Sequence, residues 1–180
     1  MLILVKVAKR FTIHEKATLL RDAVFSANDG IITTFAVVAG STGASLSSKV
    51  IIVLGFANLL ADGISMASGN YLGIKSEMEY QKGKDKTFKP EHFPLRHGTV
   101  TFFSFVLAGF LPLIPYIFGF KTGFSLSVAT VALSLFLVGS VRSFFTKKSW
   151  FVGGIEMLLV GGIAALVAYF VGFFLGRMVF

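Results

Sequence analysis

Three of the nine acidic residues, Asp29, Asp62 and Glu156, fall inside apolar stretches that are long enough to cross a bilayer. An Asp near the centre of a membrane helix costs about 3 kcal/mol, whereas each Leu, Ile, Phe or Val returns only about 0.5 kcal/mol. The stretch around Asp29 holds seven such apolar residues, so it barely inserts alone. Asp29 must therefore face other helices or a wet cavity. Such a group is either part of an ion pathway or a structural hydrogen bond between helices.

Further metal donors accompany Asp29. Asn58, Asp62 and Met66 are spaced four residues apart and form one slowly drifting stripe on a helix. In antiparallel spans, Asp29 and Met66 both lie roughly 10 to 12 Å from the same interface, so they can face each other. Asp22 and Asp29, seven residues apart, likewise share one helix face.

A thioether beside carboxylate and amide oxygens suits a late first-row divalent metal better than magnesium or calcium. The donor set of Asp29, Met66, Asn58 and Asp62 therefore favours ferrous iron or manganese. The alternative interpretation of Met66 is packing, because methionine in a membrane helix commonly fills gaps.

The composition agrees with a membrane protein. Of the 180 residues, 54% are hydrophobic and 14% are charged, and the mean hydropathy is +0.79. The chain contains no cysteine, which excludes disulfides and thiolate metal sites. The net charge of +8 comes mostly from basic residues placed between apolar stretches, which indicates membrane orientation rather than nucleic-acid binding. Residues 1–11 lack the apolar core of a signal peptide.

The predicted fold is an all-α integral membrane protein with five transmembrane helices. Fourteen of the seventeen Lys and Arg residues fall on one side if the N-terminus is cytoplasmic, so the C-terminus is expected outside. The domains are a cytoplasmic N-terminal arm, 1–21, and a membrane domain, 22–180. The spans are expected at about 22–41, 50–74, 100–119, 123–141 and 151–176.

The segment 75–98 is predicted to be a cytoplasmic loop, because Pro90 and Pro94 prevent a helix from running through its second half. His92 and His97 are interpreted as solvated histidines of this loop. Pro112 and Pro115 are expected to break the outer half of the third span.

Several longer runs resemble the vacuolar iron transporter family. In the first span they are Arg21-Asp22, 26–30 (SANDG) and 33–40 (TTFAVVAG), and in the second 58–72 (NLLADGISMASGNYL), continuing into 75–77 (KSE). The later spans contribute 109–116 (GFLPLIPY), 154–165 (GIEMLLVGGIAA) and 168–169 (AY). The match runs in order from about Arg21 to the C-terminus.

The resemblance implies a proton-coupled exporter of ferrous iron, and often manganese, built from five-helix protomers paired as a homodimer around a central metal pathway. The family's transport-site carboxylate falls on Asp29 and its methionine on Met66. A carboxylate of some members falls on Asn58, which accepts no proton here, so Asp62 is its expected substitute. The family's glutamate-rich cytosolic helices are missing between the second and third spans, where only a few acids such as Glu77 stand.

The predicted function is thus proton-coupled export of a divalent transition metal from the cytosol, in which metal and protons compete for Asp29. Asp22 and Glu77 are expected at the cytoplasmic entrance, although Asp22 can equally pair with Arg21 or cap its helix. Glu156 is either a secondary metal contact or a structural residue. The alternative function is a non-transporting assembly or regulatory subunit. No resident cofactor, enzyme activity or nucleic-acid partner is expected, and a prokaryotic cell membrane is favoured over a vacuolar one.

Overall fold

The chain is described by a computed structural model that covers residues 13–84, 93–120 and 122–179. Within these residues the structure is helical, and five helices are long and apolar enough to cross a membrane. These are Glu15–Gly43, Ser48–Lys84, Pro94–Ile117, Gly123–Thr146 and Trp150–Met178. The predicted all-helical fold with five spans is confirmed.

The long helices are α1 (Ile13–Gly43), α2 (Ser48–Lys84), α3 (Pro94–Gly109), α5 (Gly123–Thr146) and α6 (Trp150–Val179). The third span is broken as predicted. After α3 ends at Gly109, the chain forms a 3-10 turn, η2 (Leu111–Leu113), and then a single helical turn, α4 (Ile114–Ile117). Pro112 and Pro115 are each the second residue of these two short elements, where a missing N–H costs least.

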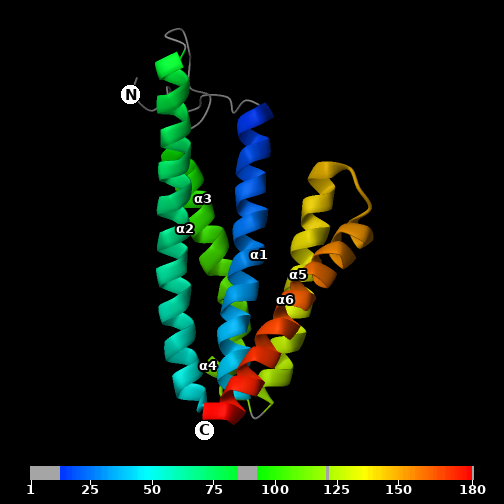
Figure 1. Cartoon of the computed structure of the whole chain (residues 1–180). Coiled ribbons are helices and arrows are strands. Elements are labelled where there is room, and N and C mark those ends of the chain that lie inside the picture. Colours follow the sequence, from blue (N-terminus) through cyan, green and yellow to red (C-terminus); the bar gives the residue numbers. More distant parts are fainter. Residues whose placement is uncertain (1–12, 85–92, 121, 180) are drawn as a thin grey trace, which may run out of the picture.

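Helix α1 occupies the centre of the bundle (Figure 1). It packs most extensively against α3 and α6, and also against α5 and α2. Figure 1 shows α2 and α3 on one side of α1 and the hairpin of α5 and α6 on the other. The start of α1 and the end of α6 lie at opposite ends of the bundle, as an odd number of spans requires. We call the end that holds the start of α1 the entrance end.

Two helices are longer than the sequence predicted. Helix α1 begins at Ile13 rather than at Asp22, so the arm predicted at 1–21 contributes its last nine residues to the helix. Helix α2 continues to Lys84, so residues 75–84 of the predicted loop are helical. Lys75 and Glu79 lie four residues apart and form an ion pair. Such a pair stabilises helical structure in the part of α2 that extends beyond the apolar span. At roughly 1.5 Å per residue, the 37 residues of α2 exceed the bilayer core by several turns.

Close approach between helices depends on glycine at Gly30. A Cβ added to Gly30 would lie 2.4 Å from the backbone oxygen of Phe105, so α1 and α3 touch backbone to backbone. On the other side of α1, a Cβ on Gly172 would lie 2.3 Å from the Cα of Gly40. These small residues hold α1 against both of its neighbours. Larger buried side chains then fill the core between them, including Ile31, Phe35, Val38, Leu59, Phe105, Leu113 and Leu135.

Candidate functional site

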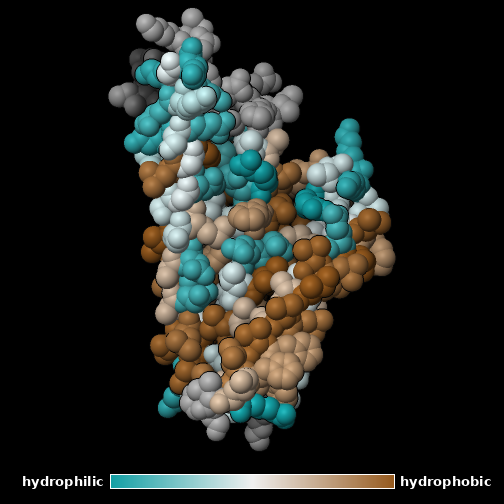
Figure 2. All heavy atoms as spheres, in the orientation of Figure 1, coloured by the Kyte–Doolittle hydropathy of each residue, from teal (hydrophilic) through white to brown (hydrophobic). Residues whose placement is uncertain are grey.

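Two carboxylates in the membrane-spanning part of α1 and α2 influence each other electrostatically. Asp29 of α1 and Asp62 of α2 are both partly buried, and they lie close enough for their charges to interact. Figure 2 shows hydrophilic residues that interrupt the apolar surface part of the way along the bundle. Two adjacent acids at membrane depth repel each other when both are ionised, so a cation or a proton between them stabilises the pair.

Asn58 lies one helical turn from Asp62 on α2 and is also partly buried. Its Nδ2 is buried and has no hydrogen-bond partner among the described residues. A half-turn of the amide exchanges its nitrogen and oxygen, so the same position can present an oxygen donor to a metal. The buried amide nitrogen of Asn58 therefore does not join described helices by a hydrogen bond.

Met66 lines a cavity of about 470 Å³ between α1, α2 and α3. We call it the α2–α3 cavity. It includes Asp22 and Ser26 of α1, and it does not include Asp29. The Oγ of Ser26 is fully buried and has no hydrogen-bond partner among the described residues. Met66 thus lies with Asp22 and Ser26, nearer the entrance end than Asp29. The complete lining is Arg21, Asp22, Phe25, Ser26, Met66, Gly69, Asn70 and Thr101.

Asp22 has two partners and is only 5% exposed. The Nη2 of Arg21 donates to its Oδ1 at 3.0 Å, and the Nδ1 of His97 donates to its Oδ2 at 2.5 Å. The predicted pairing of Asp22 with Arg21 is confirmed, but the sequence missed His97. A second ion pair lies beside this one, because Arg96 donates to the buried carboxylate of Glu15 at 3.1 Å.

The prediction that His97 is a solvated loop histidine is wrong. Pro94 begins α3 instead of prolonging the loop, because proline is favoured in the first turn of a helix. His97 consequently falls in that first turn, faces α1, and has no solvent-exposed surface. The available sequence signal for this early helix start was Pro94 itself, because proline is favoured at the first positions of a helix. His92 lies outside the described residues.

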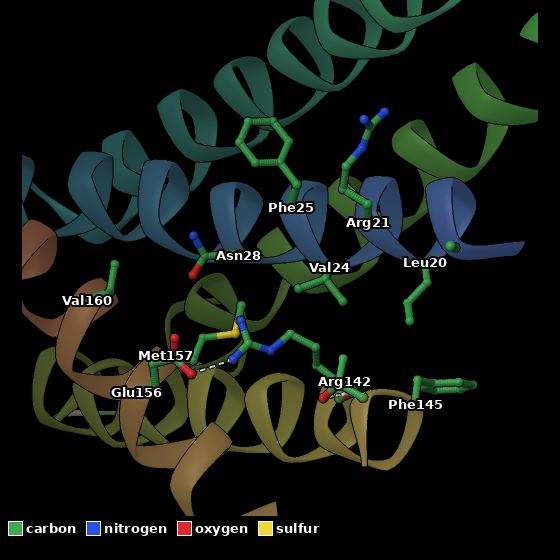
Figure 3. Close-up of a pocket in the computed structure, with 12 residues that line it drawn as sticks. Leu20, Arg21, Val24, Phe25, Asn28, Arg142, Phe145, Glu156, Met157 and Val160 are labelled. Carbon is green, nitrogen blue, oxygen red and sulfur yellow. Dashed lines mark hydrogen bonds and ion pairs between the residues drawn. The ribbon is translucent and has the colours of Figure 1, made fainter. Parts of the chain in front are cut away.

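A second cavity, of about 570 Å³, lies on the other side of α1, against α5 and α6 (Figure 3). We call it the α5–α6 cavity. In Figure 3, Asn28 of α1 lies opposite Glu156 and Met157 of α6 and Arg142 of α5. The Nη2 of Arg142 donates to Oε2 of Glu156 at 2.6 Å, and the Glu156 side chain is 51% exposed. An arginine partner makes this site unfavourable for a cation, which supports the structural interpretation of Glu156.

The remaining predicted entrance residue, Glu77, is exposed on the extension of α2 and accepts a hydrogen bond from Gln81 at 3.3 Å. It lies eleven residues beyond Met66, which is roughly 16 Å along the helix. Among residues 13–84, 93–120 and 122–179, no group of three or more His, Asp or Glu side chains is placed to hold a metal ion. A metal held at Asp29 and Asp62 would therefore need neutral donors or a further carboxylate.

The fold and the polar groups within it define a multi-pass helical membrane protein with ionisable side chains at membrane depth. The chain belongs to the VIT family, which it matches over residues 20–91 and 83–173. This is a family of transporters, not of enzymes.

The chain is similar to several vacuolar iron transporters. It is 24% identical over 220 residues to the "Vacuolar iron transporter" of Plasmodium berghei, covering 85% of this chain and 81% of that protein. It is 28% identical to the "Vacuolar iron transporter" of Toxoplasma gondii, with 85% and 73% covered. It is 27% identical over 170 residues to "Vacuolar iron transporter homolog 1" of Arabidopsis thaliana, with 89% and 85% covered. The alignment of 220 positions exceeds the 180 residues of this chain, so the Plasmodium protein carries insertions relative to it.

Proposed function

We propose that this protein exports a divalent transition metal, ferrous iron with manganese as a second ion, from the cytosol in exchange for protons. The observation that carries the proposal is the presence of two partly buried carboxylates, Asp29 and Asp62, whose charges interact at membrane depth in a VIT family member. Two carboxylates at membrane depth attract a divalent cation strongly. They also bind protons when the cation leaves, so the same groups can serve both ions.

The path begins in the α2–α3 cavity. Asp22 draws cations to the entrance end, and Met66 offers a thioether that favours transition metals over calcium and magnesium. The metal then passes to Asp29 and Asp62, with the oxygen of Asn58 as a neutral ligand. Two protons arriving from the opposite side, one for each carboxylate, displace the metal and return Asp29 and Asp62 to the neutral state.

The alternative is a non-transporting assembly or regulatory subunit whose polar groups only fasten helices together. Fastening groups make hydrogen bonds between helices, as Asn70 does when its Nδ2 donates to Thr101 at 2.7 Å. Asn58 and Ser26 instead carry buried atoms without a partner among the described residues. Unpartnered polar atoms cost stability, so they favour a ligand site over a fastening role.

The entrance end is proposed to be cytoplasmic. Among the residues that the structure describes, it carries most of the basic side chains, including those on the extension of α2, and Figure 2 shows hydrophilic residues gathered there. Positive residues favour the cytoplasmic side of a membrane. The N-terminus is then cytoplasmic and the C-terminus outside. The host membrane, for which we favour a prokaryotic cell membrane, stays a prediction.

We further propose that two protomers pair as a homodimer over the face formed by α1 and α2. Ser65, Ser68 and Gly69 of α2 are exposed on this helix, and Asp29 and Asp62 are only partly buried in one protomer. Lipid cannot hydrate carboxylates, so this face needs a polar cover. A second copy would supply the further carboxylates that a metal site of one protomer lacks.

The test is proton flux in proteoliposomes that contain the purified protein and a pH-sensitive dye. Adding ferrous iron or manganese to the cytoplasmic side should drive proton movement in the opposite direction. Asp29→Ala should abolish this flux. Glu79→Gln, which removes an exposed carboxylate on the extension of α2, is the control and should keep it. Full proton flux in Asp29→Ala would refute the site. If the unmodified protein shows no metal-dependent proton flux, the alternative of a non-transporting subunit is favoured.

A further inference from the structure

The α5–α6 cavity, of about 570 Å³, is separate from the proposed metal path and opens at the surface of the bundle. Two of its lining residues, Phe145 of α5 and Val160 of α6, are exposed. Both belong to helices long and apolar enough to cross a membrane, so the medium at the mouth of the cavity is the bilayer. A membrane lipid can therefore reach the cavity from the side.

The turn between α5 and α6 places this cavity near the headgroups of one leaflet. Phe144 and Trp150, at the two ends of the turn, are exposed, and so are Lys147 and Lys148 between them. Aromatic rings and basic side chains gather where a membrane meets water. The two lysines directly follow Thr146, which lines the cavity. A headgroup at this level therefore lies close to both the lysines and the cavity.

The charge of this region is positive. Residues 142–156 contain three basic side chains, Arg142, Lys147 and Lys148, and one acid, Glu156. Glu156 is already engaged, because it accepts a hydrogen bond from Nη2 of Arg142 at 2.6 Å. The other N–H groups of the Arg142 guanidinium have no partner among the described residues. They are therefore available to an anionic oxygen, for which arginine forms strong hydrogen bonds.

Asn28 supplies an unsatisfied polar group on the opposite wall. In Figure 3 its side chain points toward Glu156 and Met157 of α6. Its Oδ1 is buried and has no hydrogen-bond partner among residues 13–84, 93–120 and 122–179. A half-turn of the amide exchanges oxygen and nitrogen, so this position can donate a hydrogen bond instead. A ligand with oxygen acceptors would satisfy Asn28 and Arg142 together.

The rest of the cavity wall is mainly apolar. Leu20 and Val24 of α1 point toward α5 in Figure 3. Helix α6 runs away from the entrance end, so Val160 lies one turn deeper in the membrane than Glu156. An apolar chain that begins at the polar end of the cavity can thus follow Val160 toward the bilayer centre. The ligand that fits both parts carries an anionic group and an acyl chain.

We propose that the α5–α6 cavity binds an anionic phospholipid from the leaflet at the entrance end. The lipid phosphate accepts hydrogen bonds from Arg142 and Asn28, and Lys147 and Lys148 attract it from the turn. One acyl chain lies against the apolar wall and continues along α6. Basic pockets between membrane helices recognise anionic headgroups in this way. The site has a role apart from metal transport, and its test requires no transport.

Native mass spectrometry of the full chain tests the proposal. The purified protein is mixed in mild detergent with equal amounts of phosphatidylglycerol and phosphatidylcholine, and the retained lipids are identified by mass. We expect phosphatidylglycerol to be retained at least about fivefold more, as expected for one basic side chain near an anionic surface. Inorganic phosphate has no acyl chain and should not displace it. Equal retention of the two lipids, or displacement by phosphate, would overturn the proposal.

Two substitutions that break the same ion pair distinguish a lipid site from a structural contact. Arg142→Gln removes the cation and should lower retention of phosphatidylglycerol about fivefold. Glu156→Gln also breaks the pair, but it removes the acid and keeps the cation, so retention should be unchanged or higher. Arg177→Gln, which removes one positive charge at the other end of α6, is the control and should not change retention. Equal losses in Arg142→Gln and Glu156→Gln would show that the pair only joins α5 to α6.

Thermal unfolding provides an independent measurement, because a ligand that binds only the folded protein raises its Tm. Phosphatidylglycerol should raise the Tm of the unmodified protein above its value in phosphatidylcholine, and Arg142→Gln should lose this difference. If Arg142→Gln does not fold, the double variant Lys147→Gln, Lys148→Gln changes only exposed side chains and should lower retention instead. An unchanged retention in that variant would contradict the proposal. Dimers that retain no lipid would show that a second copy covers the cavity, which would also overturn it.

Discussion

The two cavities that flank the entrance half of α1 differ in how their charges are held. In the α2–α3 cavity, Asp22 is 5% exposed and is bonded to both α1 and α3. In the α5–α6 cavity, Glu156 is about half exposed and, among the described residues, is bonded to Arg142. Arg21 and Phe25 line both cavities, so α1 is the wall between them.

The difference distinguishes a side proposed to carry ions, formed by α1, α2 and α3, from a side with a structural role, formed by α5 and α6. Burying a carboxylate is costly unless it is paired, and removing one partner of a buried pair is costly again. The α1–α2–α3 side contains four buried or partly buried carboxylates, namely Glu15, Asp22, Asp29 and Asp62. The hairpin of α5 and α6 mainly contributes apolar packing and close glycine contacts. We therefore expect changes of charge to matter for transport on the first side and much less on the second.

The largest expected difference is between one carboxylate from each side. Asp62→Asn removes the partner of Asp29 without changing its size, and it should lower metal transport by at least about tenfold, as loss of a group that tunes a metal site does. Glu156→Gln should leave the rate within about twofold, because an exposed pair contributes little. Initial rates of manganese uptake into proteoliposomes measure both. Equal losses in the two variants would remove the distinction between the two sides.

A smaller effect is expected from packing at Gly30. In Gly30→Ala, the new methyl group meets the backbone of Phe105 at 2.4 Å, and a backbone atom cannot turn aside as a side chain can. We expect a loss of about 1–3 kcal/mol of stability, the usual cost of overpacking. Gly69→Ala is the control, because nothing lies within 4 Å of the added atom. Thermal unfolding in detergent compares them, and equal stability of the two variants would contradict the close contact of α1 and α3.

The smallest expected effect concerns the choice of metal. Met66→Leu conserves volume and removes the thioether from the α2–α3 cavity. Transport of ferrous iron and manganese should fall a few-fold, while the weak competition by calcium should be unchanged or stronger. Competition assays in vesicles provide the measurement. An unaltered ranking of metals would show that Met66 serves packing alone.

The sequence predicted the five spans because long apolar runs leave the chain few alternatives in a membrane. It placed the start of α1 too late and the end of α2 too early, because hydropathy indicates where the membrane begins and ends rather than where the helix does. The helical positions Ile13 to Arg21 and Lys75 to Lys84 lie at the polar ends of the spans. Hydropathy alone therefore could not assign them.

The site was predicted in part. Asp29 and Asp62 were selected from the cost of burying charge, and in the structure both are partly buried and their charges interact. The prediction that Asp29 faces Met66 used depth alone, whereas the rotation and register of packed helices set which side chains meet. The pairing of Asp22 with His97 joins two helices far apart in sequence, and spacing within one helix cannot reveal it. The unpartnered Ser26 hydroxyl was also missed, although its position four residues after Asp22 put it on the same face.

The most direct test of the account is to locate bound manganese in crystals of the protein by its anomalous X-ray scattering. The account predicts a peak between Asp29 and Asp62, which is lost in Asp29→Asn. A peak at Glu156, or manganese-loaded crystals of an actively transporting protein with no peak near Asp29, would contradict it.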